Sequence, residues 1–385
     1  MERRDVGILG ATGMVGQRFI QLLENHPWFN ITWLAASDRS AGKTYAEACA
    51  WRLDTPLPER IARMVLQPNT PAAAGPDLPR ILFSSVDAPI ARDLEPLFAA
   101  AGCAVISNSS AFRMAPDVPL VVPEVNPAHL AIIEQQPTRR GSKDQASSTP
   151  SGGYIVTNPN CSAIGLVLPL APLEARFGIE KLFVSTMQAV SGAGYPGVPS
   201  LDILSNVIPY IKNEEEKLQE EVAKLLGSAT SSGFQPAPVI VSAHCNRVPV
   251  LEGHTECVSI KLRESATREQ ILEAWQEFQP LNGKGLNGLH LPSAPLFPVE
   301  YAPEDTRPQP RLDLMRGNGM TTTVGRLRPC NLFDWKFTLF SHNTIRGAAG
   351  AAVLNAEILA VMGKFDFRDY PPVASGTASA ELISA

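Results

Sequence analysis

The chain has 385 residues, which is enough for two domains with separate hydrophobic cores, and its 44% hydrophobic and 18% charged residues are those of an ordinary globular protein. A net charge of −5 argues against nucleic-acid partners, and the lack of an apolar run of about 18 residues argues against a membrane partner. The N-terminus lacks a signal-peptide core and the six cysteines lack framework spacing, so we expect a cytoplasmic protein with reduced thiols and no bound metal.

The first predicted elements are a buried strand over 6–9, a glycine-rich turn over 10–16 and a helix that stops near His26. One face of this helix is apolar, through Val15, Phe19, Leu22 and Leu23. Glycines let the backbone approach a dinucleotide pyrophosphate, and a helix start offers free N–H groups to it. The spacing is GxxGxxG rather than GxGxxG, so a tight turn without a ligand remains the alternative.

The second predicted strand ends in a polar loop that bears on cofactor choice. NAD sites place a carboxylate here for the ribose 2′-hydroxyl, whereas NADP sites place arginine and hydroxyl groups for the 2′-phosphate. Asp38 and Arg39 are both present, and Ser37, Ser40 and Lys43 favour NADP. A solvated polar loop is the alternative interpretation.

Further strands are predicted over 31–36, 80–85, 103–108 and 121–126, with a helix over 88–101. Ligands bind at the carboxyl ends of parallel strands, so Ser84, Ser85 and Asn108 are candidates to line a cofactor crevice, although turn chemistry explains each of them too. Arg113 suits an anionic group in the same crevice, but its spacing alone favours a surface salt bridge. The polar segment 135–153 is expected to be a surface insertion.

Cys161 lies between a β-prone run, 154–156, and an apolar run compatible with a helix, 164–173. A thiol at a strand-to-helix turn lies near the positive end of a helix dipole, which favours the thiolate, a strong nucleophile toward carbonyl carbon. A buried, inert cysteine is the alternative. The nucleotide loop before Cys161 and a candidate base after it favour the catalytic interpretation.

The glycine-rich loop 191–197 is predicted to wrap a ligand or to cross near the active site, with a flexible connector as the alternative. The acidic cluster 214–216 fits the start of a helix, and the helix dipole is a sufficient reason for it. Strands over 239–250 and 257–262 are expected to pair in antiparallel fashion around the turn between them.

Two histidines compete as the base for Cys161. His254 is the better candidate, because imidazole titrates near neutral pH, and it flanks the turn together with Arg247. His244 is its competitor. Spacing does not choose between them, and a lone histidine is more often structural. The rest of the chain begins with a Pro/Gly-rich stretch over 284–320. Two strands are predicted over 321–326 and 335–340, followed by a helix rich in small residues over 343–362. The tail from 371 is expected to be poorly ordered.

These motifs, taken in order, resemble those of the aspartate-semialdehyde dehydrogenase family, and the long-insert form resembles its fungal and archaeal branch. The resemblance extends from Val6 to about Met362. The segments that carry it are GATGMVG (10–16), SDRSAGK (37–43), SNSSAFRM (107–114), VVPEVN (121–126), NPNCSAIG (158–165), QAVSGAGYPG (188–197), NVIPYIKNEEEK (206–217), NRVPVLEGH (246–254) and HNTIRGAAGAA (342–352). One match would be weak, but their joint order is specific.

The resemblance implies an α/β fold with two domains and a homo-oligomer, either a dimer or a tetramer. Residues 1–157 would form a Rossmann-like NADP-binding domain, and 158–342 an α+β catalytic and dimerisation domain of the glyceraldehyde-3-phosphate dehydrogenase-like type. A helix over 343–364 would pack back on the first domain, and 365–385 would be a tail. Differences in the insertions 135–153 and 284–310 leave the loops near the cofactor and the tetramer contacts open.

The implied activity is the NADP-dependent, reversible reductive dephosphorylation of L-4-aspartyl phosphate to L-aspartate 4-semialdehyde, in the biosynthesis of threonine, methionine, isoleucine and, in some organisms, lysine. Cys161 would form the acyl-thioester, His254 would be the acid/base and Gln188 would orient the reacting centre. The substrate-binding residues would be Arg247 for the carboxylate, Glu214 for the amino group, and Arg113 and Lys217, joined by Asn160, for phosphate.

The resemblance also implies a set of NADP contacts, namely Gly10, Thr12, Gly13, Met14, Val15, Ser37, Arg39, Ser40, Ser84, Ser85, Asn108, Ser191, Gly192 and Asn343. Two alternatives to the leading activity remain. A malonyl-CoA reductase of the same fold would use the same thiol and NADPH with another acyl donor. A non-catalytic NADP(H)-binding sensor would keep Cys161 and His254 only as relics.

Overall fold

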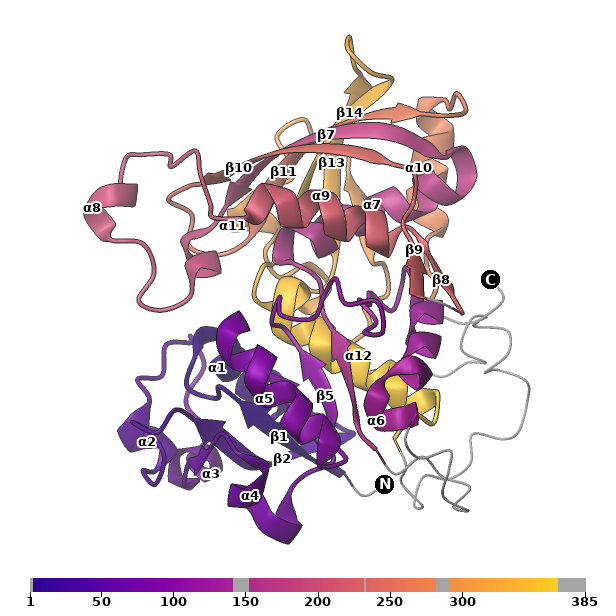
Figure 1. Ribbon diagram of the computed structural model, residues 1–385. Coiled ribbons are helices and arrows are strands. Elements are labelled where there is room, and N and C mark those ends of the chain that lie inside the picture. The colour runs from indigo at the N-terminus through magenta and orange to yellow at the C-terminus, as the bar shows by residue number, and fades with distance from the viewer. Residues whose placement is uncertain (1–2, 141–151, 232, 282–290, 366–385) are drawn as a thin grey trace.

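The computed structural model describes residues 3–140, 152–231, 233–281 and 291–365, which are built around two sheets (Figure 1). Most of the predicted insertion 135–153, the first part of 284–310 and the tail from 366 lie outside the described residues. None of the helices in the described ranges has both the length and the apolar composition that a bilayer span requires.

Six parallel strands form the first sheet, in the lower half of Figure 1. Their spatial order, β3-β2-β1-β4-β5-β6, is that of a doubly wound dinucleotide-binding sheet. The strands span Arg4–Leu9 (β1), Phe29–Ala36 (β2), Gln67–Pro68 (β3), Ile81–Ser84 (β4), Ala104–Ser107 (β5) and Tyr154–Thr157 (β6). The Rossmann-like fold expected for the first half of the chain is thereby confirmed.

Helices cover both faces of this sheet. α1 (Met14–Leu23) and α12 (Gly350–Val361) share one hydrophobic core with one face. α5 (Ala88–Ala100) covers the other face, where Phe98 packs in a core with Leu82. The long final helix therefore returns from the second sheet to the first, as Figure 1 shows in yellow.

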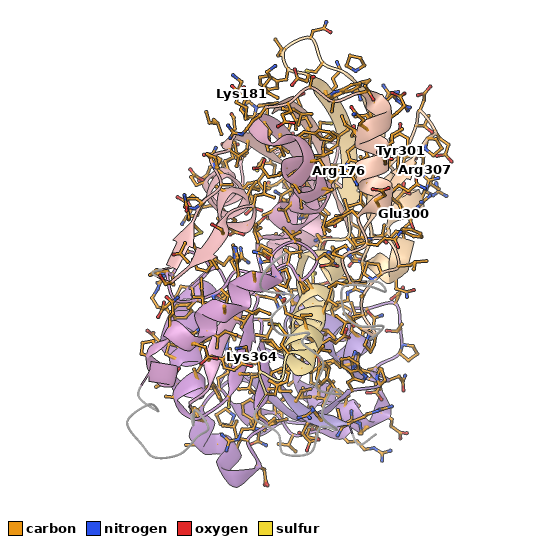
Figure 2. The ribbon with its side chains drawn as sticks, turned by 90° about the vertical axis from the view of Figure 1, so that its right-hand side faces the viewer. Arg176, Lys181, Glu300, Tyr301, Arg307 and Lys364 are labelled. Atoms are coloured by element: carbon orange, nitrogen blue, oxygen red, sulfur yellow. The ribbon has the colours of Figure 1, made fainter. Side chains whose placement is uncertain are left out.

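A π-helical turn, Ile345–Ala349, precedes α12. Figure 2 labels Lys364, just after α12, in the lower part of the molecule, and Arg176 and Tyr301 in the upper part. Lys364 Nζ lies 3.1 Å from the carboxylate of Glu134, so the end of α12 is tied to the N-terminal half of the chain. The domain boundaries proposed from the sequence remain a prediction.

The second sheet mixes parallel and antiparallel pairs in the order β10-β7-β11-β14-β13-β12. Its strands span Ile179–Gln188 (β7), Ile240–Arg247 (β10), His254–Leu262 (β11), Val299–Ala302 (β12), Thr322–Pro329 (β13) and Trp335–Ser341 (β14). A small hairpin of Ser228–Thr230 (β8) and Gly233–Gln235 (β9) stands apart from it.

The predicted hairpin of β10 and β11 is wrong, because β7 lies between them. β7 pairs with β10 in parallel and with β11 in antiparallel fashion. β10 and β11 therefore run in opposite directions, as expected, but the connection 248–253 crosses the end of β7. An alternation of apolar and polar residues predicts which side chains of a strand face the core, but it does not predict which strand lies next to it in the sheet.

Helices α7 (Cys161–Phe177), α9 (Glu214–Leu225) and α10 (Arg268–Glu277) lie on one side of this sheet (Figure 1). The apolar residues of all three join one core with the buried residues of the strands. The remaining short helices are α2 (Tyr45–Ala48), α3 (Glu59–Arg63), α4 (Pro71–Ala74), α6 (Pro137–Arg140), α8 (Ser200–Ile203) and α11 (Pro310–Asp313).

The strand predicted over 121–126 is also wrong, because this segment is a turn. The side chain of Asn126 accepts from the backbone N–H of Val122 at 2.8 Å, which bends the segment back on itself. Pro123 has no N–H to give to a ladder. The carboxylate of Glu124, in the bend, accepts hydrogen bonds from both terminal nitrogens of Arg346 at 2.7 and 2.8 Å. This ion pair of two buried side chains holds the turn against the start of the last helix.

Candidate active site

The predicted nucleophile is the first residue of α7. Asn160 caps the helix, because its Oδ1 accepts from the backbone N–H of Ser162 at 2.8 Å and of Ala163 at 3.2 Å. Cys161 Sγ lies 3.1 Å from Nε2 of His254, the first residue of β11. The sulfur and imidazole, 93 residues apart in the chain, are therefore in direct contact.

His254 is fully buried, and both of its ring nitrogens are engaged. The backbone N–H of Ala189 donates to Nδ1 at 3.1 Å. With Nδ1 accepting, the neutral ring carries its proton on Nε2, which faces Cys161. Burial, and then the charge of Arg247, lower the pKa of His254 to about 3, so the ring is neutral at pH 7.

The competing histidine is not near the sulfur. His244 is exposed on β10, and its ring packs edge-on against Phe183 at a centroid distance of 5.3 Å. Arg247 of the same strand is buried on the other face, next to His254. The odd spacing of three residues between His244 and Arg247 places them on opposite faces of the strand.

The groups around Cys161 oppose the thiolate that its place at a helix start favours. Burial, and then the carboxylate of Glu214, raise the pKa of the Cys161 thiol to about 12, although Arg113 and Arg247 act in the opposite direction. The helix dipole is a weaker influence here because Asn160 already receives N–H groups of the first turn. Burial therefore favours a thiol beside a neutral imidazole at neutral pH.

Arg247 and Gln188 end two paired strands, and they are direct partners in the β10–β7 register. Arg247 Nη1 donates to the carbonyl of Ala189 at 2.8 Å, which holds the guanidinium beside His254. A Cβ added to Gly192 would lie 2.7 Å from Arg247 Nη1 and 3.2 Å from the His254 ring, so this position has no room for a side chain. The loop 191–197 thus crosses the site, as predicted.

One face of α9 contributes four charged residues, at Glu214, Lys217, Glu221 and Lys224. Glu214 accepts from Asn160 Nδ2 at 2.7 Å, and Lys217 Nζ lies 3.6 Å from the same carboxylate. Sequence reasoning found the first two residues and missed the others, although all four share the spacing of one helical face. Glu214, at the acidic start of α9, therefore also contacts the residue before the nucleophile, in addition to interacting favourably with the helix dipole.

Arg113 forms a buried ion pair and not the surface salt bridge that its spacing favours. Its Nη1 donates to Glu221 at 2.9 Å and its Nη2 to the carbonyl of Asn108 at 2.8 Å. Glu221 also accepts from the backbone N–H of Asn160, so one carboxylate joins the arginine to the start of α7. Lys224 holds the loop after Arg113 through three backbone carbonyls.

The predicted nucleotide loop has the geometry that a pyrophosphate needs. Gly10 has φ +74°, a conformation that favours glycine, and a Cβ on Gly16 would lie 2.4 Å from the carbonyl oxygen of Gly10. Gly13 begins α1 without a side-chain cap, so N–H groups of the first turn remain for an anion. Thr12, next to Gly13, is partly exposed at this turn. These residues fit a bound dinucleotide.

The other residues predicted to contact the cofactor differ in their exposure to solvent. Ser37 and Arg39 are exposed after β2, and Ser85 touches the glycine turn through a 3.1 Å bond from its Oγ to the carbonyl of Leu9. Ser84 is different, because it is fully buried beside Glu95 of α5. Its side chain therefore does not line the crevice. The partly exposed set also includes Met14, Val15, Ser40 and Asn108.

Asn343 is held within the protein rather than aimed at a ligand. Its Oδ1 accepts from the backbone N–H of Gly253 at 2.7 Å, and its Nδ2 donates to Ser191 Oγ at 2.8 Å. Asn343 therefore positions the residue before His254 together with the loop that crosses the site. Gly347, which sequence reasoning missed, lets the π-helical turn approach the nucleophile, because a Cβ there would lie 2.7 Å from Cys161 Cβ.

Glu256 lies behind the reacting pair, two residues beyond His254 on the same face of β11. It is fully buried, and neither carboxyl oxygen has a hydrogen-bond partner among the described residues. Gly165, one turn after Cys161 on α7, lies beside it, and a Cβ on Gly165 would approach Ser341 Cβ to 2.9 Å. Burial, and then the charge of Glu214, raise the pKa of Glu256 well above its usual value.

We expect Glu256→Gln to raise the Tm at pH 8 and to leave it unchanged near pH 4.5. A carboxyl group whose pKa is raised by folding destabilises the folded protein increasingly as the pH rises above the unfolded pKa, because the unfolded chain then loses the proton more easily. The amide of glutamine does not ionise, so the variant avoids this loss of stability at pH 8. Each kcal/mol gained corresponds to about 2–4 °C. Scanning calorimetry from pH 4.5 to pH 8 measures the difference. The exposed Glu264→Gln is the control, and a lower Tm for Glu256→Gln at pH 8 would contradict the expectation.

The chain matches the model of the semialdehyde dehydrogenase NAD-binding domain over residues 5–133 and that of the semialdehyde dehydrogenase dimerisation domain over residues 170–346. The aspartate-semialdehyde dehydrogenase of Methanothermobacter thermautotrophicus is 51% identical over 357 residues, which cover 92% of this chain and 98% of the relative. That of Candida albicans is 45% identical over 368 residues, which cover 93% and 98%.

Solved structures are similar as well. Aspartate semialdehyde dehydrogenase with NADP from Candida albicans matches with a TM-score of 0.83 and 42% identity, over 94% of this chain and 99% of that chain. Aspartate semialdehyde dehydrogenase II complexed with ASA from Vibrio cholerae matches with a TM-score of 0.71 and 27% identity, over 95% and 100%.

Proposed function

Because this chain belongs to the aspartate-semialdehyde dehydrogenase family, we propose that it catalyses the NADP-dependent, reversible conversion of L-4-aspartyl phosphate to L-aspartate 4-semialdehyde and phosphate. The biosynthesis of aspartate-derived amino acids such as threonine and methionine is the corresponding role. The observation that carries the proposal is the 3.1 Å contact between Cys161 Sγ and His254 Nε2. We place the reaction in the cytoplasm, where reducing conditions preserve a thiol nucleophile.

In the oxidative direction, the partly exposed thiol of Cys161 first loses its proton to solvent. The resulting thiolate forms a bond to the aldehyde carbon, and the carbonyl oxygen takes the negative charge. His254 Nε2–H faces the sulfur and is placed to donate first to the thiolate and then to this oxyanion. NADP held at the glycine turn 10–16 would supply the acceptor for the hydride that leaves the same carbon. A phosphate oxygen then attacks the resulting thioester, and the carbon–sulfur bond breaks to return the thiolate.

The substrate contacts follow from the charges around the sulfur. Arg247, beside His254, suits the substrate carboxylate, and Glu214, near the start of α7, suits the amino group. Arg113 and Lys217 are the cations for phosphate, with Asn160 between them. Glu221 and Glu214 already pair with these two cations, so each keeps a fixed orientation before phosphate arrives. Gln188, buried at the end of β7, is proposed to orient the reacting carbon.

The test is an assay with aspartate semialdehyde, phosphate and each nicotinamide cofactor. We expect NADPH formation that requires both semialdehyde and phosphate. In the reverse direction, aspartyl phosphate should support NADPH oxidation and malonyl-CoA should not, because Glu214 faces an amino group that malonate lacks. NADPH binding without turnover of any acyl donor would contradict the proposal and favour a non-catalytic sensor.

We expect Arg39→Ala to lower kcat/KM for NADP by about 10–100-fold, the value of a lost charge-assisted hydrogen bond. Arg39 is exposed at the end of β2, next to Ser40, where a 2′-phosphate would lie. The value for NAD should change by less than about 2-fold, because NAD has no phosphate there. Steady-state kinetics with both cofactors measures the effect, and the exposed Arg63→Ala is the control. An equal loss of kcat/KM with NAD would show that Arg39 does not bind the 2′-phosphate.

We also propose that the protein is a dimer or tetramer, with an interface that includes the projection around α8 (Figure 1). Large apolar side chains are exposed along it, at Leu201, Leu204, Val207 and Tyr210. Such a patch marks an association surface. The dimerisation-domain model covers this region.

We expect Leu201→Asp to shift the protein toward monomer, because Leu201 is 92% exposed and a charge there would be buried by association. Sedimentation velocity at micromolar concentration measures the mass. Leu97→Asp, an exposed position on α5 that is remote in sequence from this projection, is the control. A wild-type protein that sediments as a monomer would contradict the proposal.

A further inference from the structure

The connection 248–253 carries His254 at its end and is held by the second half of the chain. The backbone N–H of Val190 donates to the carbonyl of Val250 at 2.8 Å, and that of Ser191 to the carbonyl of Leu251 at 3.2 Å. Gly253 is held by Asn343, as described above. These contacts hold the backbone of the connection against the second half of the chain.

The side chain of Glu252 links this connection to the first half of the chain. Glu252 Oε1 lies 2.5 Å from Nη2 of Arg18, which belongs to α1. The two residues are 234 positions apart, and their side chains are only 22% and 7% exposed. A charge pair shielded from solvent in this way is screened little by salt and is costly to break from one side. We call this pair the Arg18–Glu252 clasp.

The clasp joins the two parts of the reaction. Arg18 is one helical turn after Met14, at the start of the helix whose free N–H groups suit the dinucleotide pyrophosphate. Glu252 is two residues before His254, and its carboxylate also accepts from Thr344 Oγ1 at 3.4 Å. A short, rigid helix therefore has a predicted cofactor contact at one end and a contact to the His254 connection one turn further along.

We propose that the Arg18–Glu252 clasp couples occupancy of the dinucleotide site to the placement of His254 against Cys161. This inference rests on the proposed function, since it assigns the clasp to the same site. Arg18 and Glu252 are positioning residues, because neither touches the reacting atoms. Coupling of this kind is reciprocal, so cofactor binding should change the reactivity of the sulfur, and loss of the clasp should uncouple the two.

The direct test uses alkylation of Cys161 by iodoacetamide, which needs no turnover. We expect saturating NADP to change the alkylation rate of the wild-type protein by about 5-fold or more, the range of typical coupling energies. In Glu252→Gln, which keeps the shape and loses the charge, the ratio of the rates with and without NADP should fall to about 1. A wild-type ratio near 1, or an unchanged ratio in the variant, would overturn the proposal.

Kinetics gives a second readout that a merely structural role would not produce. Glu252→Gln and Arg18→Met should each lower kcat by about 10–100-fold and leave KM for phosphate within about 2-fold, because the phosphate contacts lie elsewhere. The double variant should lose no more than either single one, since both break the same interaction. Additive losses would overturn the proposal. Arg18→Lys, which keeps the charge, should recover part of the loss.

The matched control is Glu24→Gln, at the end of the same helix, which breaks a longer pair, of 3.5 Å, with the 47% exposed side chain of Arg60. It should change neither the alkylation ratio nor kcat by more than about 2-fold, because exposed pairs contribute little. Should the protein lack semialdehyde turnover altogether, the proposed function would fail, and the alkylation ratios would still decide whether the clasp couples the dinucleotide site to Cys161.

Discussion

Replacing Cys161 with serine is expected to lower the rate of phosphate-dependent NADPH formation by about 10⁴-fold or more, the scale on which loss of a covalent nucleophile acts. Serine keeps the volume of the side chain but not the acidity of the thiol, and Nε2–H of His254, 3.1 Å from the sulfur, cannot ionise a hydroxyl. Steady-state and single-turnover assays with semialdehyde measure the loss. NADPH binding and Tm should stay near their wild-type values.

A pre-steady-state experiment separates a covalent role from a structural one. Without phosphate, the wild-type protein should release one equivalent of NADPH per site and hold an acyl group on Cys161, detectable by mass spectrometry, and Cys161→Ser should do neither. Cys245→Ser is the matched control, because Cys245 is buried on β10 in the same half of the chain. Near-normal turnover of Cys161→Ser would refute the assignment of the nucleophile.

The second large effect is expected for His254→Asn, which should lower kcat/KM for semialdehyde by about 10²–10⁴-fold. Asparagine is too short to place a donor where Nε2 lies, so the thiolate and the oxyanion lose their partner. The same substitution at His244, exposed on the opposite face of the second sheet, is the control and should leave kcat/KM near the wild-type value. A comparable loss at both histidines would contradict the pairing seen in the structure.

The pH dependence of kcat/KM checks the protonation states behind this expectation. Burial holds the pKa of His254 at about 3 and that of the Cys161 thiol at about 12, so neither group changes its charge near pH 6.5. The profile should therefore lack a limb at the usual histidine pKa and should rise with pH as a larger fraction of the thiol ionises. A bell-shaped profile centred near neutrality would show that the free enzyme holds a thiolate–imidazolium pair instead.

The fold was predictable where neighbouring residues determine the structure. The turn 10–16 follows from its glycines, because Gly10 needs a positive φ and Gly16 has no room for a side chain. The start of α7 follows from Asn160, whose side chain caps the next two N–H groups. These devices act over three or four residues, so they are readable without any knowledge of the rest of the chain.

The sequence predicted which residues form the candidate site better than it predicted how they contact one another. Cys161, His254 and Arg247 were identified from motif order, and the structure brings them together. Glu221 was missed because its partner, Arg113, lies 108 positions away in the chain. Glu256 was missed because a glutamate in an alternating strand is expected to face solvent, and no local pattern marks one that is buried.

Sequence alone therefore determined most of the local elements of this protein, the family to which it belongs and the residue types of its candidate site. Only the tertiary structure decided that β7 separates β10 from β11, that His254 rather than His244 meets the sulfur, and that burial raises the pKa of the Cys161 thiol. The reason is physical. Turns and helix caps depend on contacts between neighbours in the chain, whereas strand order, burial and pKa depend on what the completed fold packs around each group.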